Sequence, residues 1–148
     1  MKSPARLASL LPILMLAACG NEPPCTDAAV VHTVRTMAAS LIVEISVPQK
    51  LPEAIDLTRA VPLDAIIVEQ WDANLKSAVC SARYKLDHSV LWRDAKAASS
   101  RVSDPALKQS LEGLNTDLSG VIVGRLVYSV RPTSDKNWWI TLNAMQPD

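Results

Sequence analysis

Two runs near the end of the chain alternate apolar and polar residues, and they constrain the fold more than any other feature. The runs are residues 121–131 and 137–145, joined by a turn at 132–136. Successive side chains of a strand point to opposite faces, so each run has one apolar face. The apolar faces hold Ile122, Leu126, Tyr128 and Val130 in the first run and Trp138, Ile140 and Leu142 in the second. This pattern predicts an antiparallel hairpin that buries one face.

A second hairpin is predicted from residues 63–71 and 77–86. The first of these runs is strand-like, and Asp72-Ala73-Asn74 is typical of a turn. The second run alternates strictly, and its apolar side holds Cys80, Ala82, Tyr84 and Leu86. Two hairpins together make a sheet of about four strands, and such a sheet needs a covering layer.

Two helices are expected to supply that layer. Thr26-Asp27 can cap a helix that begins after Cys25 and ends at Pro48. Its apolar stripe is Val30, Val34, Met37, Leu41 and Ile45. Ser103-Asp104-Pro105 is typical of a second helix start, followed by a stripe of Leu107, Leu111, Leu114 and Leu118 that runs down to Gly120.

The order helix, hairpin, helix, hairpin predicts an α+β domain: an antiparallel sheet of about four strands with two main helices packed on it. Residues 51–61 are either a short helix opened by Pro52 or an extended connection. Residues 87–102 carry weak signals. With half of its residues hydrophobic, the chain is expected to be ordered over most of its length.

The first nineteen residues have the features of an export signal. Lys2 and Arg6 precede an uncharged apolar run over 7–18, which is shorter than the roughly 20 residues needed to span a bilayer. The run ends in Leu16-Ala17-Ala18-Cys19, which resembles the lipobox of bacterial lipoproteins. The alternatives are an uncleaved anchor or an ordinary secretory signal, but the latter prefers a small residue where Leu16 stands.

The resemblance to bacterial lipoproteins implies how the chain is processed and where it is held. Cleavage would fall between Ala18 and Cys19, the Cys19 thiol would carry a diacylglycerol, and the new amino group would usually be acylated as well. Two or more acyl chains such as palmitate hold a protein stably on a membrane. Gly20 stands where an Asp would imply inner-membrane retention, so the outer membrane, facing the periplasm, is expected in a Gram-negative host.

This reading divides the chain into a signal peptide over 1–18, a lipidated cysteine and tether over 19–24, and one globular domain over 25–148. The five residues from Gly20 to Pro24 reach at most about 17 Å, so the domain is held close to the membrane. Loss of Lys2 and Arg6 takes the basic residues from 15 to 13 against 15 acidic residues. The resulting net charge of −2 argues against a nucleic-acid partner.

Cys25 and Cys80 remain after Cys19 is lipidated. An even pair in an exported protein favours a disulfide, and two buried free thiols are the alternative. A cysteine just before a helix and another in an early strand, with a terminal hairpin, resembles small bacterial lipoproteins in which a helix packs on an antiparallel, broadly cystatin-like sheet. Residues 87–118 depart from that pattern, and the resemblance implies no activity.

No catalytic or cofactor motif is found in the sequence, so no cofactor is expected besides the lipid on Cys19. His32 and His88 have no metal-binding neighbours at ligand spacing, and no metal is expected. No serine stands in a known nucleophile motif. The acids Glu44, Glu53, Asp56 and Glu69 are scattered, and a glycosidase pair would need two of them across one cleft.

Trp138 and Trp139 are the most unusual local feature. In a strand their rings point to opposite faces, so one is expected in the core. Trp139 is then either an exposed binding residue or is covered by the 87–118 segment. The expected function is a non-enzymatic binding, assembly or inhibitor module, including the immunity type, that is anchored in the membrane and meets an envelope protein. The alternative is a small envelope hydrolase whose site forms only in three dimensions.

Overall fold

The computed structural model describes residues 22–47, 49–52, 55–117 and 119–148, and it confirms the predicted α+β class. The predicted signal peptide, the predicted lipobox and Cys19 lie outside the described residues. The helices are α1 (Ala28–Ser46), α2 (His88–Ala98) and α3 (Pro105–Glu112), and the strands are β1 (Leu63–Asp72), β2 (Ser77–Asp87), β3 (Val121–Pro132) and β4 (Trp138–Pro147). Short 3-10 turns are η1 (Pro24–Thr26), η2 (Thr58–Ala60) and η3 (Ser99–Arg101).

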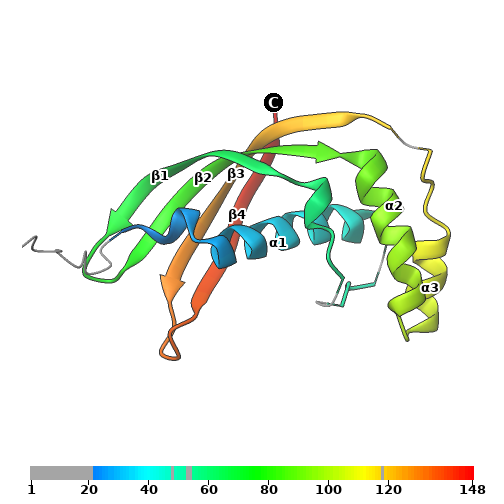
Figure 1. The fold of residues 1–148 in the computed structure, drawn as a ribbon, viewed down its shortest axis with the longest axis horizontal. Coiled ribbons are helices and arrows are strands. Elements are labelled where there is room, and N and C mark those ends of the chain that lie inside the picture. The colour runs from blue at the N-terminus through cyan, green and yellow to red at the C-terminus, as the bar shows by residue number, and fades with distance from the viewer. Residues whose placement is uncertain (1–21, 48, 53–54, 118) are drawn as a thin grey trace, which may run out of the picture.

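The four strands form one antiparallel sheet in the order β1-β2-β3-β4, so both predicted hairpins are confirmed. The sheet is strongly twisted, and α1 crosses one of its faces, called here the inner face (Figure 1). Both hairpin turns lie at one end of the sheet. The connection from β2 to β3, which contains α2 and α3, lies at the other end (Figure 1).

The first helix begins where the sequence predicts. The Asp27 side chain accepts hydrogen bonds from the backbone N–H groups of Ala29 and Val30, which caps α1. The predicted apolar stripe is right at its start and wrong at its end, because Leu41 is 45% exposed and Ile45 is 80% exposed. The buried stripe instead consists of Val30, Val34, Ala38, Ala39 and Val43. Small alanines at its centre let the helix lie close to the sheet.

The connection between the two hairpins contains two helices where the sequence predicts one. Residues 88–98, where the sequence gives weak signals, form α2, whose N-terminus is capped by Asp87 accepting from the Val90 N–H. Helix α3 ends at Glu112, so its predicted extension to Gly120 is wrong. The Asn115 side chain accepts the Asp117 N–H and competes with helical hydrogen bonding there. Leu114 is half-buried beyond the helix, and Leu118 lies outside the described residues.

Residues 51–61 are neither a helix nor fully extended where they are described. They contain the single 3-10 turn η2, and residues 53–54, like Pro48, lie outside the described residues. Arg35 on α1 holds this connection in place: its guanidinium donates to the carbonyls of Thr58 at 2.5 Å and Val61 at 3.0 Å.

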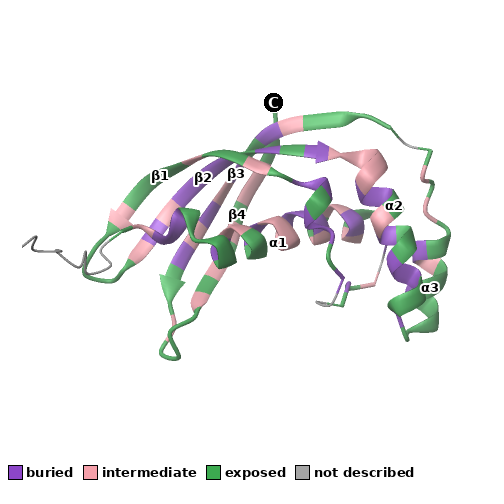
Figure 2. Cartoon of the chain, viewed as in Figure 1, coloured by how far each residue is buried: buried purple, intermediate pink, exposed green. Residues whose placement is uncertain are grey.

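The core lies between α1 and the inner face of the sheet and extends to α2 and α3 (Figure 2). Cys25 and Cys80 are fully buried and form the predicted disulfide. The Tyr128 hydroxyl donates to the Cys25 carbonyl at 2.8 Å. Gly124 makes room for Tyr84, since a Cβ there would lie 2.6 Å from the Tyr84 hydroxyl oxygen and 2.2 Å from the Gln146 carbonyl oxygen.

Helix α1 is the one helix within the described ranges that is long and apolar enough to cross a membrane by length and composition. Its buried side chains pack in the core, and Cys25, three residues before the helix begins at Ala28, is bonded to β2. Within the domain, α1 is therefore the helix that packs against the centre of the sheet.

Removing the disulfide should cost up to about 4 kcal/mol in the free energy of unfolding, because the bond closes a long loop in the unfolded chain. We expect Cys25→Ser/Cys80→Ser to show this loss in urea denaturation of the mature domain. The reduced wild-type protein should match the variant, which controls for side-chain effects. A double variant within about 1 kcal/mol of the oxidised protein would contradict the expected stabilisation.

Alkaline pH should destabilise the domain through Tyr128. Burial raises the pKa of Tyr128 to about 12, whereas an unfolded tyrosine titrates near about 10. The stabilisation is therefore complete below pH 10, and about 2 to 3 kcal/mol is lost as the pH rises to 12. Tyr128→Phe should flatten this loss, and at neutral pH it should cost about 1 to 3 kcal/mol by leaving the Cys25 carbonyl unpaired.

Urea denaturation at a series of pH values measures both effects. Burial also raises the pKa of Tyr84, so the variant should keep a smaller alkaline loss. Equal pH dependence in the wild type and in Tyr128→Phe would contradict the assignment to Tyr128.

Candidate binding face

The sheet has a second face, called here the outer face, which points away from α1. Burial alternates along β2 and β3: the residues that face α1 are buried, and most of their neighbours are half-buried or exposed (Figure 2). The strand pairing aligns Trp71, Ala78, Val130 and Ile140 in one row on the inner face. The next row, on the outer face, is Gln70, Val79, Ser129 and Thr141.

A shallow depression of about 470 Å³ lies on the outer face near the hairpin turns. The side chains that line it on the outer face are mostly uncharged hydrogen-bonding groups with one aromatic ring. They include Gln70, Ser77, Ser129, Arg131, Trp139, Thr141 and Asn143. All four strands contribute, so the depression depends on the register of the whole sheet.

Trp139 is the largest exposed group in the depression, with 57% of its surface accessible. It pairs across the hairpin with Arg131, whose guanidinium carbon lies 5.9 Å from the centre of the indole ring. This cation–π contact orients the ring on the surface. Trp138 is half-buried and packs against the core. The prediction that the two rings lie on opposite faces is therefore confirmed.

The sequence left open whether residues 87–118 cover Trp139. Their described part, 87–117, does not: α2 and α3 pack beyond the end of the sheet that is opposite to the hairpin turns (Figure 1). Trp92 is buried, and Trp71 is half-buried.

The polar groups beside Trp139 are arranged for hydrogen bonding. The Asn143 amide donates to the Ser129 hydroxyl at 2.6 Å, which leaves the Asn143 carbonyl oxygen for another donor. Asp72, at the rim, accepts backbone N–H groups from Asn74 and Leu75 and so belongs to the β1–β2 turn. The ionisable side chains that line the depression are thus a turn-forming carboxylate and the guanidinium of Arg131.

A charged cluster lies next to the depression on the same face. Glu69, at a bulge in β1, accepts hydrogen bonds from the Ser81 hydroxyl and from the guanidinium of Arg125. The Ser81 hydrogen bond, followed by Arg125, lowers the pKa of the Glu69 carboxyl. Glu69 is therefore held ionised, as an acceptor and not as a proton donor.

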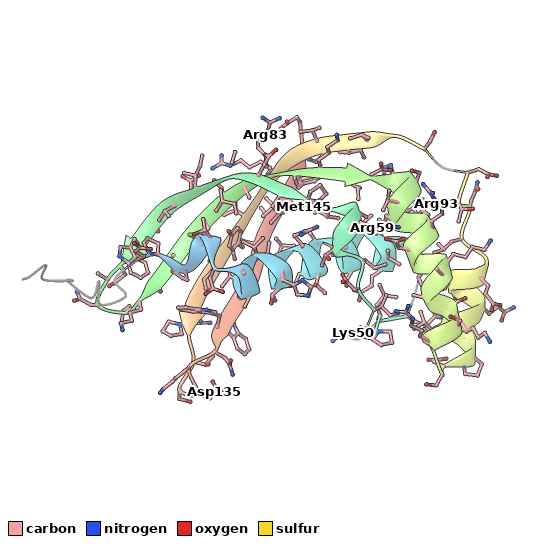
Figure 3. All side chains as sticks on the ribbon, viewed as in Figure 1. Lys50, Arg59, Arg83, Arg93, Asp135 and Met145 are labelled. Atoms are coloured by element: carbon pink, nitrogen blue, oxygen red, sulfur yellow. A yellow bond between two sulfur atoms is a disulfide. The ribbon has the colours of Figure 1, made fainter. Side chains whose placement is uncertain are left out.

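Of the scattered acids, Glu53 lies outside the described residues, Glu69 is on the outer face of the sheet, and Asp56 is in a separate hollow. Asp56 lines a hollow of about 270 Å³ together with Arg59 and Asp94. Arg59 forms an ion pair with Asp94 at 2.6 Å, and it points toward α2 (Figure 3). Hydrogen bonds from Thr58 lower the pKa of Asp56. A general acid needs a raised pKa, so this geometry does not favour acid catalysis.

The histidines are placed apart from the outer-face depression. His32 is exposed on α1, and His88 at the start of α2 stacks on Trp92 with 6.3 Å between ring centres. Across the described ranges, no three His, Cys, Asp or Glu side chains are grouped so that they could hold a metal ion.

An apolar groove of about 230 Å³ lies on the other side of the sheet, beside the second half of α1. It is lined by Leu41, Ile45, Ile122, Met145 and Pro147, among others. Met145 lies between the sheet and α1 (Figure 3). The sequence assigned Leu41 and Ile45 to the core, so this groove was not foreseen.

Sequence reasoning identified Trp139 but not its neighbours. Gln70, Ser129 and Arg131 are ordinary polar residues, and only the strand register brings them to the depression that Trp139 lines. Comparisons of this chain with protein-family models, with curated proteins and with solved structures find no match.

Proposed function

We propose that this protein is a lipid-anchored bacterial envelope protein whose outer sheet face binds another envelope protein without catalysing a reaction. The anchor is supported by the lipobox Leu16-Ala17-Ala18-Cys19 and by the charged and apolar segments before it. In a Gram-negative host the protein would face the periplasm from the outer membrane. The short tether to Cys25 keeps this face near the membrane surface.

The observation that carries the binding role is Trp139 on an uncovered sheet face. Exposed tryptophans and arginines are the residue types most enriched at the energetic centres of protein interfaces. Here the two lie together and are ringed by amide and hydroxyl groups that can pair with a partner's backbone. Because the depression is open and shallow, it fits a protein surface or a peptide segment better than an enclosed small molecule.

The anchor is tested by Cys19→Ser. We expect the variant to lose incorporation of labelled palmitate and to leave the membrane fraction, because the lipid-carrying thiol is absent. The Cys25–Cys80 bond should remain, so a thiol count on the unfolded, unreduced protein should find no free cysteine in either form. Continued labelling or full retention in the membrane would overturn the lipoprotein assignment.

The binding face is tested by a photo-reactive amino acid in place of Thr141, which is exposed in the depression. We expect a discrete protein adduct in cells, and its yield should fall by about tenfold or more when Trp139→Ala is added. The same photo-reactive group in place of exposed Lys108 on α3 is the matched control.

Trp139→Ala should leave the free energy of unfolding within about 0.5 kcal/mol of the wild type, since the ring is largely exposed. This separates lost binding from lost folding. An adduct that forms equally at position 108, or that is unaffected by Trp139→Ala, would contradict the proposed binding face.

A further inference from the structure

Both hairpin turns place a lysine in a left-handed backbone conformation. Lys76 in the β1–β2 turn has a φ of 50°, and Lys136 in the β3–β4 turn has a φ of 66°. Glycine adopts this conformation without a steric penalty, whereas a residue with a Cβ does not. Strained residues of this kind suggest a functional reason for the side chain.

In each turn the acidic side chain accepts hydrogen bonds from within the turn. The Asp72 carboxylate is held by the N–H groups of Asn74 and Leu75. Asp135 lies at the tip of the β3–β4 hairpin (Figure 3), where its carboxylate accepts hydrogen bonds from the side chains of Thr133 and Asn137. These bonds lower the pKa of Asp135, and the bond from Thr133 is the largest cause. The acids are therefore used inside the turns.

The lysines and Leu75 point to solvent instead. Leu75, at the β1–β2 turn, is 67% exposed, and Lys76 and Lys136 are exposed as well. Over the part of the chain that the structure describes, neither lysine takes part in an ion pair. The two turns thus combine an apolar side chain with two unpaired ammonium groups.

The attachment point of the tether lies toward this end of the sheet. Cys25 is bonded to Cys80, with 5.8 Å between their Cα atoms. Along β2, Cys80 is three residues from Ser77 at the turn end and seven from Asp87 at the far end, or about 10 Å against about 23 Å. Six residue steps connect Cys19 to Cys25 and span at most about 20 Å.

We propose that the end of the sheet formed by these two turns rests on an anionic bilayer surface, with Leu75 at the headgroup level and Lys76 and Lys136 on lipid phosphates. This inference rests on the proposed lipid anchor. An exposed leucine next to one lysine, with a second lysine in the other turn at the same end of the sheet, matches the boundary between acyl chains and headgroups. The strands would then rise from the membrane surface, and the outer face with Trp139 would point sideways, parallel to the membrane plane.

The contact is tested with the mature lipidated protein in vesicles that contain brominated phospholipids and phosphatidylglycerol. Leu75→Trp adds an indole at the proposed contact, and Lys108→Trp adds one on exposed α3, at the opposite end (Figure 1). The native tryptophans are the same in both variants. We expect bromine to quench the emission added by Leu75→Trp and not the emission added by Lys108→Trp.

The charge contribution is tested by adding Lys76→Gly/Lys136→Gly to the Leu75→Trp reporter. Glycine suits both backbone positions, so the fold should be kept. Loss of two lysines near an anionic surface should weaken the contact by about thirtyfold, at about fivefold for each. Lys96→Ala/Lys108→Ala removes two exposed lysines from α2 and α3 and should leave the quenching unchanged.

The outcomes separate this inference from the anchor. A wild-type protein that carries no lipid and does not stay with the vesicles would overturn the proposed function. A lipidated, vesicle-bound protein in which both reporters are quenched equally, or in which neither is quenched, would overturn only the membrane-facing end. Equal loss of quenching with the two lysine pairs would also overturn it.

Discussion

The bond between Cys25 and Cys80 fixes the arrangement on which the other features depend. It joins η1, the short turn that leads into α1, to the second strand of the sheet, and the Tyr128 hydroxyl on β3 donates to the Cys25 carbonyl. All three side chains are fully buried. With its start attached at this point, α1 has to lie across the inner face. The outer face is therefore left open.

The strands could be predicted from the sequence because their burial is one-sided. In β2 and β3 every second residue faces α1, so an apolar row such as Leu126, Tyr128 and Val130 is visible in the sequence itself. Helix α2 lacked such a signal. Its buried positions include Leu91, Ala95 and Ala98, which have helical spacing, but two of them are alanines that contribute little to an apolar stripe. Its position depends on contacts with α1 and η2, which are distant in sequence.

The candidate site was predictable only in part for a related reason. Alternation alone places Trp138 and Trp139 on opposite faces. The neighbours of Trp139 depend on three strand pairings, two of which contain register shifts, among them one between Val68 and Gln70 and one between Val127 and Tyr128. A bulge moves every later side chain to the other face, and nothing in the local sequence marks it. The polar depression is thus a property of the register and not of a motif.

Helix α1 has one set of side chains buried against the sheet and another set that is exposed, and this division explains why the two faces of the sheet differ in chemistry. Ala38 and Ala39 bring the helix close to the strands, and Val43 continues the buried stripe. Leu41 and Ile45 lie outside this stripe, and with Ile122 and Met145 they line the apolar groove on the inner side. Trp139 and its polar neighbours lie on the other side of the sheet. Because the sheet separates the two surfaces, a partner on the outer face leaves the groove open, and substitutions on one side should not weaken binding on the other.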